Sequence, residues 1–148
     1  MTNTDKEKEY PTIVLQWQTC VEMANAISQR RDSMNNIFIT LNLALMAAIS
    51  LTWDPKSLFL LVAGCVLCVL WEFFINNYRK LNEAKFLVIQ SLEDKLPEAP
   101  FKDEWQYLKK KGKYLDSTLL EGIMPKLFII LYIIASGIIL QQMPTLVL

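Results

Sequence analysis

The side chains of this 148-residue chain that could do chemistry are thiols, carboxylates, amines and phenols, because it contains no histidine. This excludes histidine-based acid–base catalysis and histidine-ligated metals. Cys65 and Cys68 have the C-x-x-C spacing of redox and metal sites, but they lie inside an apolar run with no strand before it. We interpret them as small packing residues and keep a redox or metal role as the weaker alternative. No nucleophile has a visible activating partner, so the sequence predicts no enzymatic activity, cofactor or metal.

Two polar residues in or beside the apolar runs need partners. The amide of Asn42 calls for an interhelical hydrogen bond, which contributes about 1 kcal/mol in lipid. We interpret Asn42 as packing within or between subunits, and a pore-lining role is the alternative. Glu72 follows the second run, where a carboxylate is costly unless it reaches water or a cation. Gly64 and Gly137 are expected to be points of close helix approach.

Lys85 falls in the middle of an apolar helical face. Placing residues 81–96 on a helical wheel gathers the apolar side chains around it. In one interpretation its stem packs while the ammonium reaches the edge of the face. In the other the cation is paired or lines a site for an acidic group, and Glu121 is the candidate partner.

Three nearly uncharged apolar runs must position these residues. They cover residues 37–53, 57–71 and 127–140, and the first two are separated only by residues 54–56. Runs of this length cannot be surface helices of so short a chain, so lipid is the expected solvent. We therefore predict an all-α integral membrane protein with three transmembrane helices.

The distribution of basic residues predicts the orientation, although fifteen basic residues balance fifteen acidic ones and give no sign of a nucleic-acid partner. Basic residues flank the runs on one side of the expected hairpin, whereas its turn carries only Lys56. The positive-inside rule gives a cytoplasmic N-terminus and an outer C-terminus. A basic collar at the inner interface is expected to attract anionic headgroups. It consists of Arg30, Arg31, Arg79 and Lys80.

The long segments predict an antiparallel helical hairpin over residues 12–96, after a disordered cytoplasmic N-terminus at 1–11. Its transmembrane parts are expected at 36–53 and 57–74, and its cytoplasmic halves at 12–35 and 75–96. The alternative for the first half is an amphipathic helix lying on the membrane, kinked near Asp32. Residues 97–124 are expected to form a cytoplasmic or interfacial segment with a short helix near Trp105. The third transmembrane helix is expected at 125–142, opened by Pro125, and a short outer tail at 143–148.

The segment 71–105 carries a specific combination of residues. It contains the pattern Y-R-x-L-N-x-A-K-F-x-V-I-x-x-L-E-x-x-L-P, followed by Glu-Trp and then by a Glu and a Pro before the last run. The matching positions are Tyr78, Arg79, Leu81, Asn82, Ala84, Lys85, Phe86, Val88, Ile89, Leu92, Glu93, Leu96, Pro97, Glu104, Trp105, Glu121 and Pro125. About a third of the chain therefore resembles the RipA-type family of small octameric bacterial inner-membrane proteins, and the rest agrees only in hydropathy.

The resemblance implies a homo-oligomer of the bacterial inner membrane, with eight subunits, and it transfers no catalytic residue. It marks Asn82, Lys85 and Phe86 as a signature cluster. The leading hypothesis is a structural, scaffolding or regulatory membrane oligomer that contacts anionic lipid and a cytoplasmic protein partner. The alternative is an oligomeric pore or channel-like effector. Candidate interface or pore residues are Asn42, Glu72, Asn82, Lys85, Phe86, Trp105 and Glu121.

Overall fold

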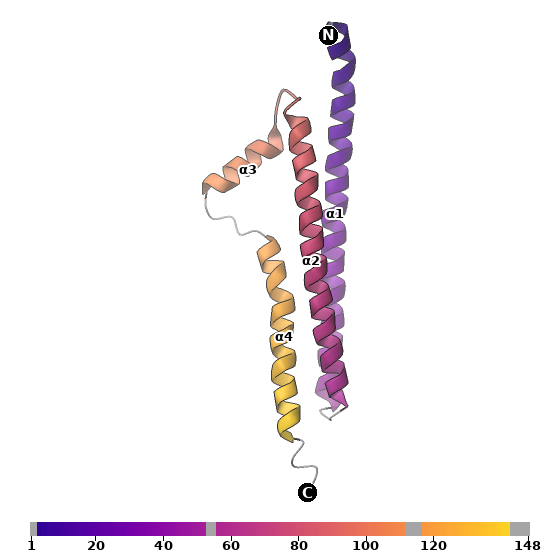
Figure 1. The fold of residues 1–148 in the computed structure, drawn as a ribbon, viewed down its shortest axis with the longest axis vertical. Helices are drawn as coiled ribbons and strands as arrows, with labels where there is room; N and C mark the ends of the chain where they lie inside the picture. Colours follow the sequence, from indigo (N-terminus) through magenta and orange to yellow (C-terminus); the bar gives the residue numbers. More distant parts are fainter. Residues whose placement is uncertain (1–2, 53–55, 112–116, 143–148) are drawn as a thin grey trace. The chain divides into compact units, whose positions relative to one another are not determined.

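The computed structural model describes residues 3–52, 56–111 and 117–142, and these form four helices with no strand among them (Figure 1). The helices are α1 (Asn3–Thr52), α2 (Ser57–Glu93), α3 (Pro100–Lys111) and α4 (Ser117–Gln142). Three apolar segments are long enough to cross a membrane, namely Tyr10–Leu51, Ser57–Glu93 and Leu119–Gln141. The predicted all-α class with three transmembrane helices is therefore confirmed.

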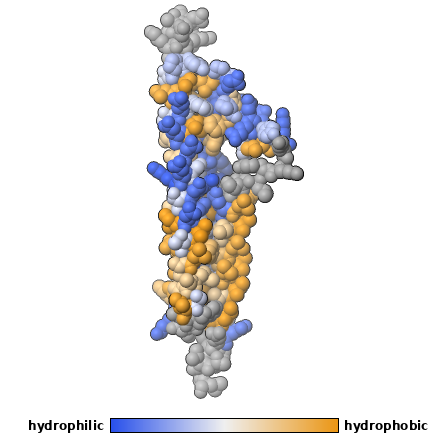
Figure 2. Space-filling model, turned by 180° about the vertical axis from the view of Figure 1, so that it is seen from behind, coloured by the Kyte–Doolittle hydropathy of each residue, from blue (hydrophilic) through white to orange (hydrophobic). Residues whose placement is uncertain are grey.

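The chain divides into two compact units. The apolar unit comprises Arg31–Asn77 and Ser117–Leu148, and the polar unit comprises Met1–Arg30 and Tyr78–Asp116. Each unit contains a part of α1 and a part of α2, and the apolar unit adds α4 whereas the polar unit adds α3. On the face seen in Figure 2, hydrophobic residues predominate on the apolar unit and hydrophilic residues on the polar unit.

In the apolar unit, α1, α2 and α4 pack around one aromatic and aliphatic core. Asn35 contacts Trp71 and Asn42 contacts Cys68, so a higher residue number on α1 is matched by a lower one on α2. This order makes the two helices antiparallel, as expected for a hairpin. The core is made of Phe38, Ile49, Leu61, Cys68, Trp71, Ile75, Phe128, Tyr132, Ala135 and Ile139.

In the polar unit, α1 and α2 are again antiparallel and α3 packs beside them. Trp17 contacts Glu93 and Met23 contacts Lys85, so the helices run in opposite directions here too. Ala24 and Ile89 are buried between neighbouring elements. The charges carried by this unit require water or headgroups, because ionised side chains are costly in hydrocarbon.

The helix bounds correct three expectations. α1 is helical from Asn3, so the segment 1–11 expected to be disordered is helical over its described part, which includes Pro11. The lysines and glutamates at positions 6–9 are good helix formers and allow this extension. α4 begins at Ser117, so Pro125 lies inside the helix instead of opening it. α2 ends at Glu93, three residues before the expected end.

Other boundary predictions meet the described structure only in part. α1 continues as one helix through Asp32, where the alternative had placed a kink. The short helix near Trp105 is present as α3. The expected turn at 54–56 lies outside the described residues except for Lys56, and the expected outer tail at 143–148 lies entirely outside them.

Candidate functional site

Asn42 links the three helices of the apolar unit and is fully buried. Its Nδ2 donates to the carbonyl oxygen of Phe38 at 2.8 Å, within α1. Its Oδ1 accepts a hydrogen bond from Tyr132 OH of α4 at 2.8 Å and one from Cys68 Sγ of α2 at 3.3 Å. The amide is therefore satisfied by the three helices that surround it, as lipid-buried polar groups must be.

This arrangement settles where Asn42 and its neighbours lie within one subunit. Asn42 is buried in the interior of the apolar unit, where α2 and α4 supply its interhelical partners. Thr40, Ser50 and Ser136 instead donate to carbonyl oxygens of their own helices. In the described part of the apolar unit, Asn42 thus has the interhelical role that its sequence position predicted.

Gly64 of α2 allows α4 to approach closely. A Cβ built on Gly64 would overlap the ring of Tyr132, whereas one built on Gly137 would meet nothing within 4 Å. The expectation of close approach is therefore correct for Gly64 and wrong for Gly137 within the subunit. The missing side chain at Gly64 is what lets Tyr132 reach Asn42.

Aromatic contacts around Trp71 also join the three helices of the apolar unit. Trp71 Nε1 donates to Asn35 Oδ1 at 2.9 Å, which satisfies the indole N–H of a side chain that is only 1% exposed. The Trp71 ring stacks on Phe38, with ring centroids 5.7 Å apart. It also meets Phe128 of α4 at 6.2 Å.

Two ion pairs join helices of the apolar unit. Arg31 Nη2 lies 3.3 Å from Glu121 Oε1, with both side chains less than a fifth exposed. Glu121 was the partner considered for Lys85, and its pairing with Arg31 corrects that expectation. Glu72 Oε1 lies 3.7 Å from Lys126 Nζ, at a more exposed position. Glu72 thus reaches a cation, Lys126 of α4, as the cost of a carboxylate in lipid required.

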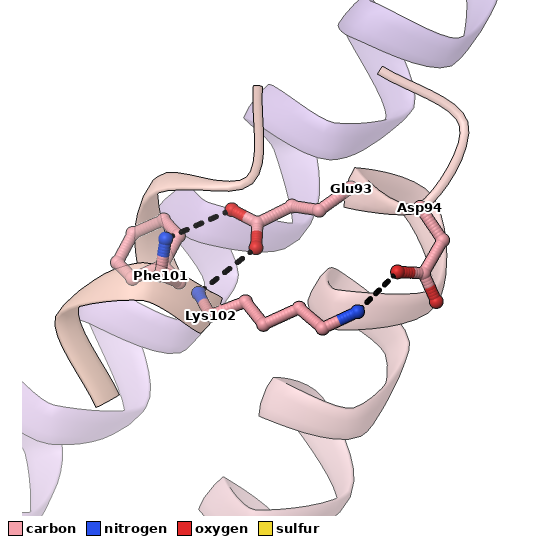
Figure 3. Close-up of polar contacts among 4 residues, drawn as sticks. All are labelled: Glu93, Asp94, Phe101 and Lys102. Atoms are coloured by element: carbon pink, nitrogen blue, oxygen red, sulfur yellow. Dashed lines mark hydrogen bonds and ion pairs between the residues drawn. The ribbon is translucent and has the colours of Figure 1, made fainter. Parts of the chain in front are cut away.

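Glu93 of the polar unit is only 1% exposed, and its carboxylate accepts hydrogen bonds from three residues (Figure 3). Its Oε1 accepts a hydrogen bond from the backbone N–H of Phe101, and its Oε2 one from that of Lys102, each at 3.2 Å. Oε1 also accepts from Trp17 Nε1 at 3.4 Å. A carboxylate of α2 thus caps the first turn of α3, where helical N–H groups have no partner and negative charge is favoured.

Aromatic packing supports this cap. Phe101 lies between Trp17 of α1, at 6.0 Å between ring centroids, and Phe86 of α2, at 5.9 Å. Pro100 opens α3, a position where its lack of an N–H costs nothing. On the exposed side, Lys102 Nζ donates to Asp94 at 2.8 Å, and this hydrogen bond raises the pKa of the Lys102 ammonium. Together these contacts dock α3 on the hairpin.

The signature cluster has three different environments. Phe86 belongs to the packing of α3. Asn82 is half-buried, and its Oδ1 has no partner among the described residues. Lys85 is half-buried, and its Nζ lies 3.8 Å from Met23 Sδ, a weak acceptor. The sequence therefore identified Lys85 as unusual but could not name the residue beside it.

The remaining predicted site residues lie on the surface. Trp105 is 45% exposed, and Lys109 Nζ lies 5.3 Å from its ring centroid, a cation–π contact. Of the predicted collar, Arg79 pairs with Glu83 on its own helix. Arg30 and Lys80 are exposed, whereas Arg31 is engaged with Glu121.

Sequence reasoning missed Glu93 and Tyr132 as site residues. Glu93 was noted only as one position of the family-like pattern. Its spacing in the sequence does not indicate that the backbone N–H of Phe101 donates a hydrogen bond to it. Tyr132 could have been found, because it is the one tyrosine of the apolar run 127–140 and its hydroxyl needs a partner in lipid. Across the described residues, no group of three or more Cys, Asp or Glu side chains is placed to hold a metal ion.

These features define an integral membrane protein whose helices are joined by buried polar contacts. The family model described as the octameric membrane protein family (8xMP) matches residues 14–141, which is most of the chain. The chain belongs to the octameric membrane protein family. The comparisons with curated proteins and with solved structures gave no match. Membership supports self-association in a membrane, as the resemblance implied.

Proposed function

We propose that this chain is the subunit of a non-catalytic homo-oligomeric scaffold in the bacterial inner membrane, close to the RipA-type proteins. One observation carries the proposal: polar side chains inside the apolar unit contact one another across helices. Asn42, Cys68 and Tyr132 form one such contact, and Asn35 and Trp71 form another. Groups used in this way hold helices together and are not free to act on a substrate.

The exposed side chains of each unit suggest which partners the scaffold contacts. Apolar side chains such as Phe59 and Phe73 are exposed on the apolar unit and suit lipid or a neighbouring subunit. On the polar unit, Arg30 and Lys80 are exposed and could contact anionic headgroups. Trp105 on α3 is exposed beside Lys109 and offers an anchor for a cytoplasmic protein.

A conductance experiment tests scaffold against pore. We expect purified protein to form an octamer by native mass spectrometry and to give no ionic current in planar bilayers, because Asn42 is turned inward. Glu72→Gln and its matched variant Lys126→Gln should leave both results unchanged. A steady current that falls in Glu72→Gln but not in Lys126→Gln would replace the scaffold with a channel whose mouth contains the Glu72 carboxylate.

The proposed orientation can be tested separately. The N-terminus and the segment around Lys110 are expected in the cytoplasm, and the turn at Lys56 on the outer side, because basic residues are retained inside. Single cysteines placed at Lys56 and at Lys110, in a chain whose own three cysteines are replaced by serine, should react from opposite sides with a membrane-impermeant maleimide. Labelling of both from one side would contradict the orientation.

A further inference from the structure

Two faces of the polar unit repeat the same spacing in opposite directions. The α2 face consists of Leu81, Lys85, Val88 and Leu92, separated by four, three and four residues. The α1 face consists of Ala26, Glu22, Thr19 and Leu15, separated by the same steps in the descending direction. Steps of three and four keep residues on one side of a helix, so each set forms a stripe. Each stripe contains a single charge, and the two charges have opposite signs.

Both stripes are available to a partner. On the α1 face all four residues are exposed, and Leu15 is 64% exposed. On the α2 face Leu81 and Val88 are 46% and 48% exposed, while Lys85 and Leu92 are half-buried. Because the polar unit is rich in charge and suited to water, the exposed leucine and valine side chains of these stripes are expected to be covered by protein.

Lys85 and Glu22 are the charges at the centre of the stripes, and the described part of the subunit pairs neither with an opposite charge. Lys85 Nζ lies 3.8 Å from the sulfur of Met23, which is a weak acceptor. A cation held within an apolar stripe is stabilised by a carboxylate that approaches from outside.

The two stripes also lie at matching heights along the helix axes. The contact between Lys85 and Met23 places Lys85 beside the residue that follows Glu22. Because α1 and α2 are antiparallel, the same alignment sets Leu81 against Ala26, Val88 against Thr19 and Leu92 against Leu15. Each residue rises about 1.5 Å, so these pairs agree in height to within about half a turn.

Symmetry then brings one stripe to the other. Copies inserted alike in one membrane are related by an axis along the membrane normal, so equivalent residues stand at equal heights. In a closed ring, one face of each subunit meets a different face of the next. We propose that the α2 face of one copy packs on the α1 face of its neighbour, with Lys85 of the first paired to Glu22 of the second. This proposal rests on the oligomeric function proposed above, and it assigns the interface between subunits on the cytoplasmic side.

Charge reversal in mixed rings tests this contact. Glu22→Lys and Lys85→Glu should each lose the octamer on native mass spectrometry, since every contact then opposes like charges. Coexpression of the two variants should restore an octamer containing four copies of each, because an alternating ring pairs opposite charges at every contact. The matched control is Glu83→Lys, the same change on a neighbouring exposed position of α2, and it should leave the octamer intact.

Three other results would contradict the Lys85–Glu22 contact or the proposed function. If the two single variants stay octameric, Glu22 and Lys85 do not form the contact, whereas the scaffold itself stands. If coexpression fails but the double reversal in one chain restores the octamer, the pair lies within a subunit and the proposal is overturned. If the unaltered chain is not an oligomer, the proposed function fails first. Recovery by mixing also shows that the single variants fold.

Discussion

Replacing Glu93 with alanine is expected to detach α3 from the polar unit. The backbone N–H groups of Phe101 and Lys102 would lose their acceptor, and the indole of Trp17 would lose its own. Hydrogen bonds to a buried carboxylate are among the stronger ones, so we expect docking of α3 to weaken by about 3 kcal/mol. Hydrogen–deuterium exchange should report this as ~100-fold faster exchange of the two amides.

Two matched variants separate the cap from general damage. Glu93→Gln keeps the shape and one acceptor oxygen, so its exchange rates should fall between those of the unaltered chain and Glu93→Ala. Asp94→Asn removes only the negative charge beside Lys102 Nζ and should leave the Phe101 amide protected. Equal exchange at Phe101 in Glu93→Ala and in the unaltered chain would show that the carboxylate does not hold α3.

The second large effect is expected at Gly64. In Gly64→Ala the new methyl group would overlap the Tyr132 ring, and α4 must shift to accommodate it. Overpacking of this kind costs about 1–3 kcal/mol, and here it also pulls Tyr132 OH away from Asn42. A lower melting temperature in detergent, followed by circular dichroism, is the expected result.

The chain supplies its own controls for that change. Gly137→Ala and Gly122→Ala add the same methyl group where nothing lies within 4 Å, so each should alter stability by less than about 1 kcal/mol. Combining Gly64→Ala with Tyr132→Ala should cost less than the sum of the two single changes, because the clash is already gone. Additive losses would place the damage somewhere other than this contact.

The membrane fold was predictable because lipid acts on sequence in a simple way. Long uncharged runs and a three-residue separation determine three helices and a hairpin whatever the exact contacts are. Boundaries were less predictable, as Pro125 shows. Proline often opens a helix, but the preceding turn of α4 is fixed here by the ion pair of Glu121 with Arg31, from a helix far away in the sequence.

The sequence predicted the type of contact at the candidate site, but it did not predict which residues make that contact. Asn42 had to bond across helices, yet its partners Cys68 and Tyr132 lie 26 and 90 residues away. Periodicity says which face a residue occupies, and it does not say which remote helix covers that face. Glu93 illustrates the same limit, since its role depends on the corner that turns α3 back toward α2.

The amide of Asn42 also bears on how the chain is made. Synthesis delivers α1 and α2 long before α4, and the thiol of Cys68 can bond to Asn42 as soon as these two helices enter the bilayer. The stronger donor, Tyr132, arrives only with the last helix. In the hairpin of α1 and α2, the Asn42 amide therefore already has one interhelical hydrogen bond before α4 is made. The hydroxyl of Tyr132 then gives α4 a defined place to pack.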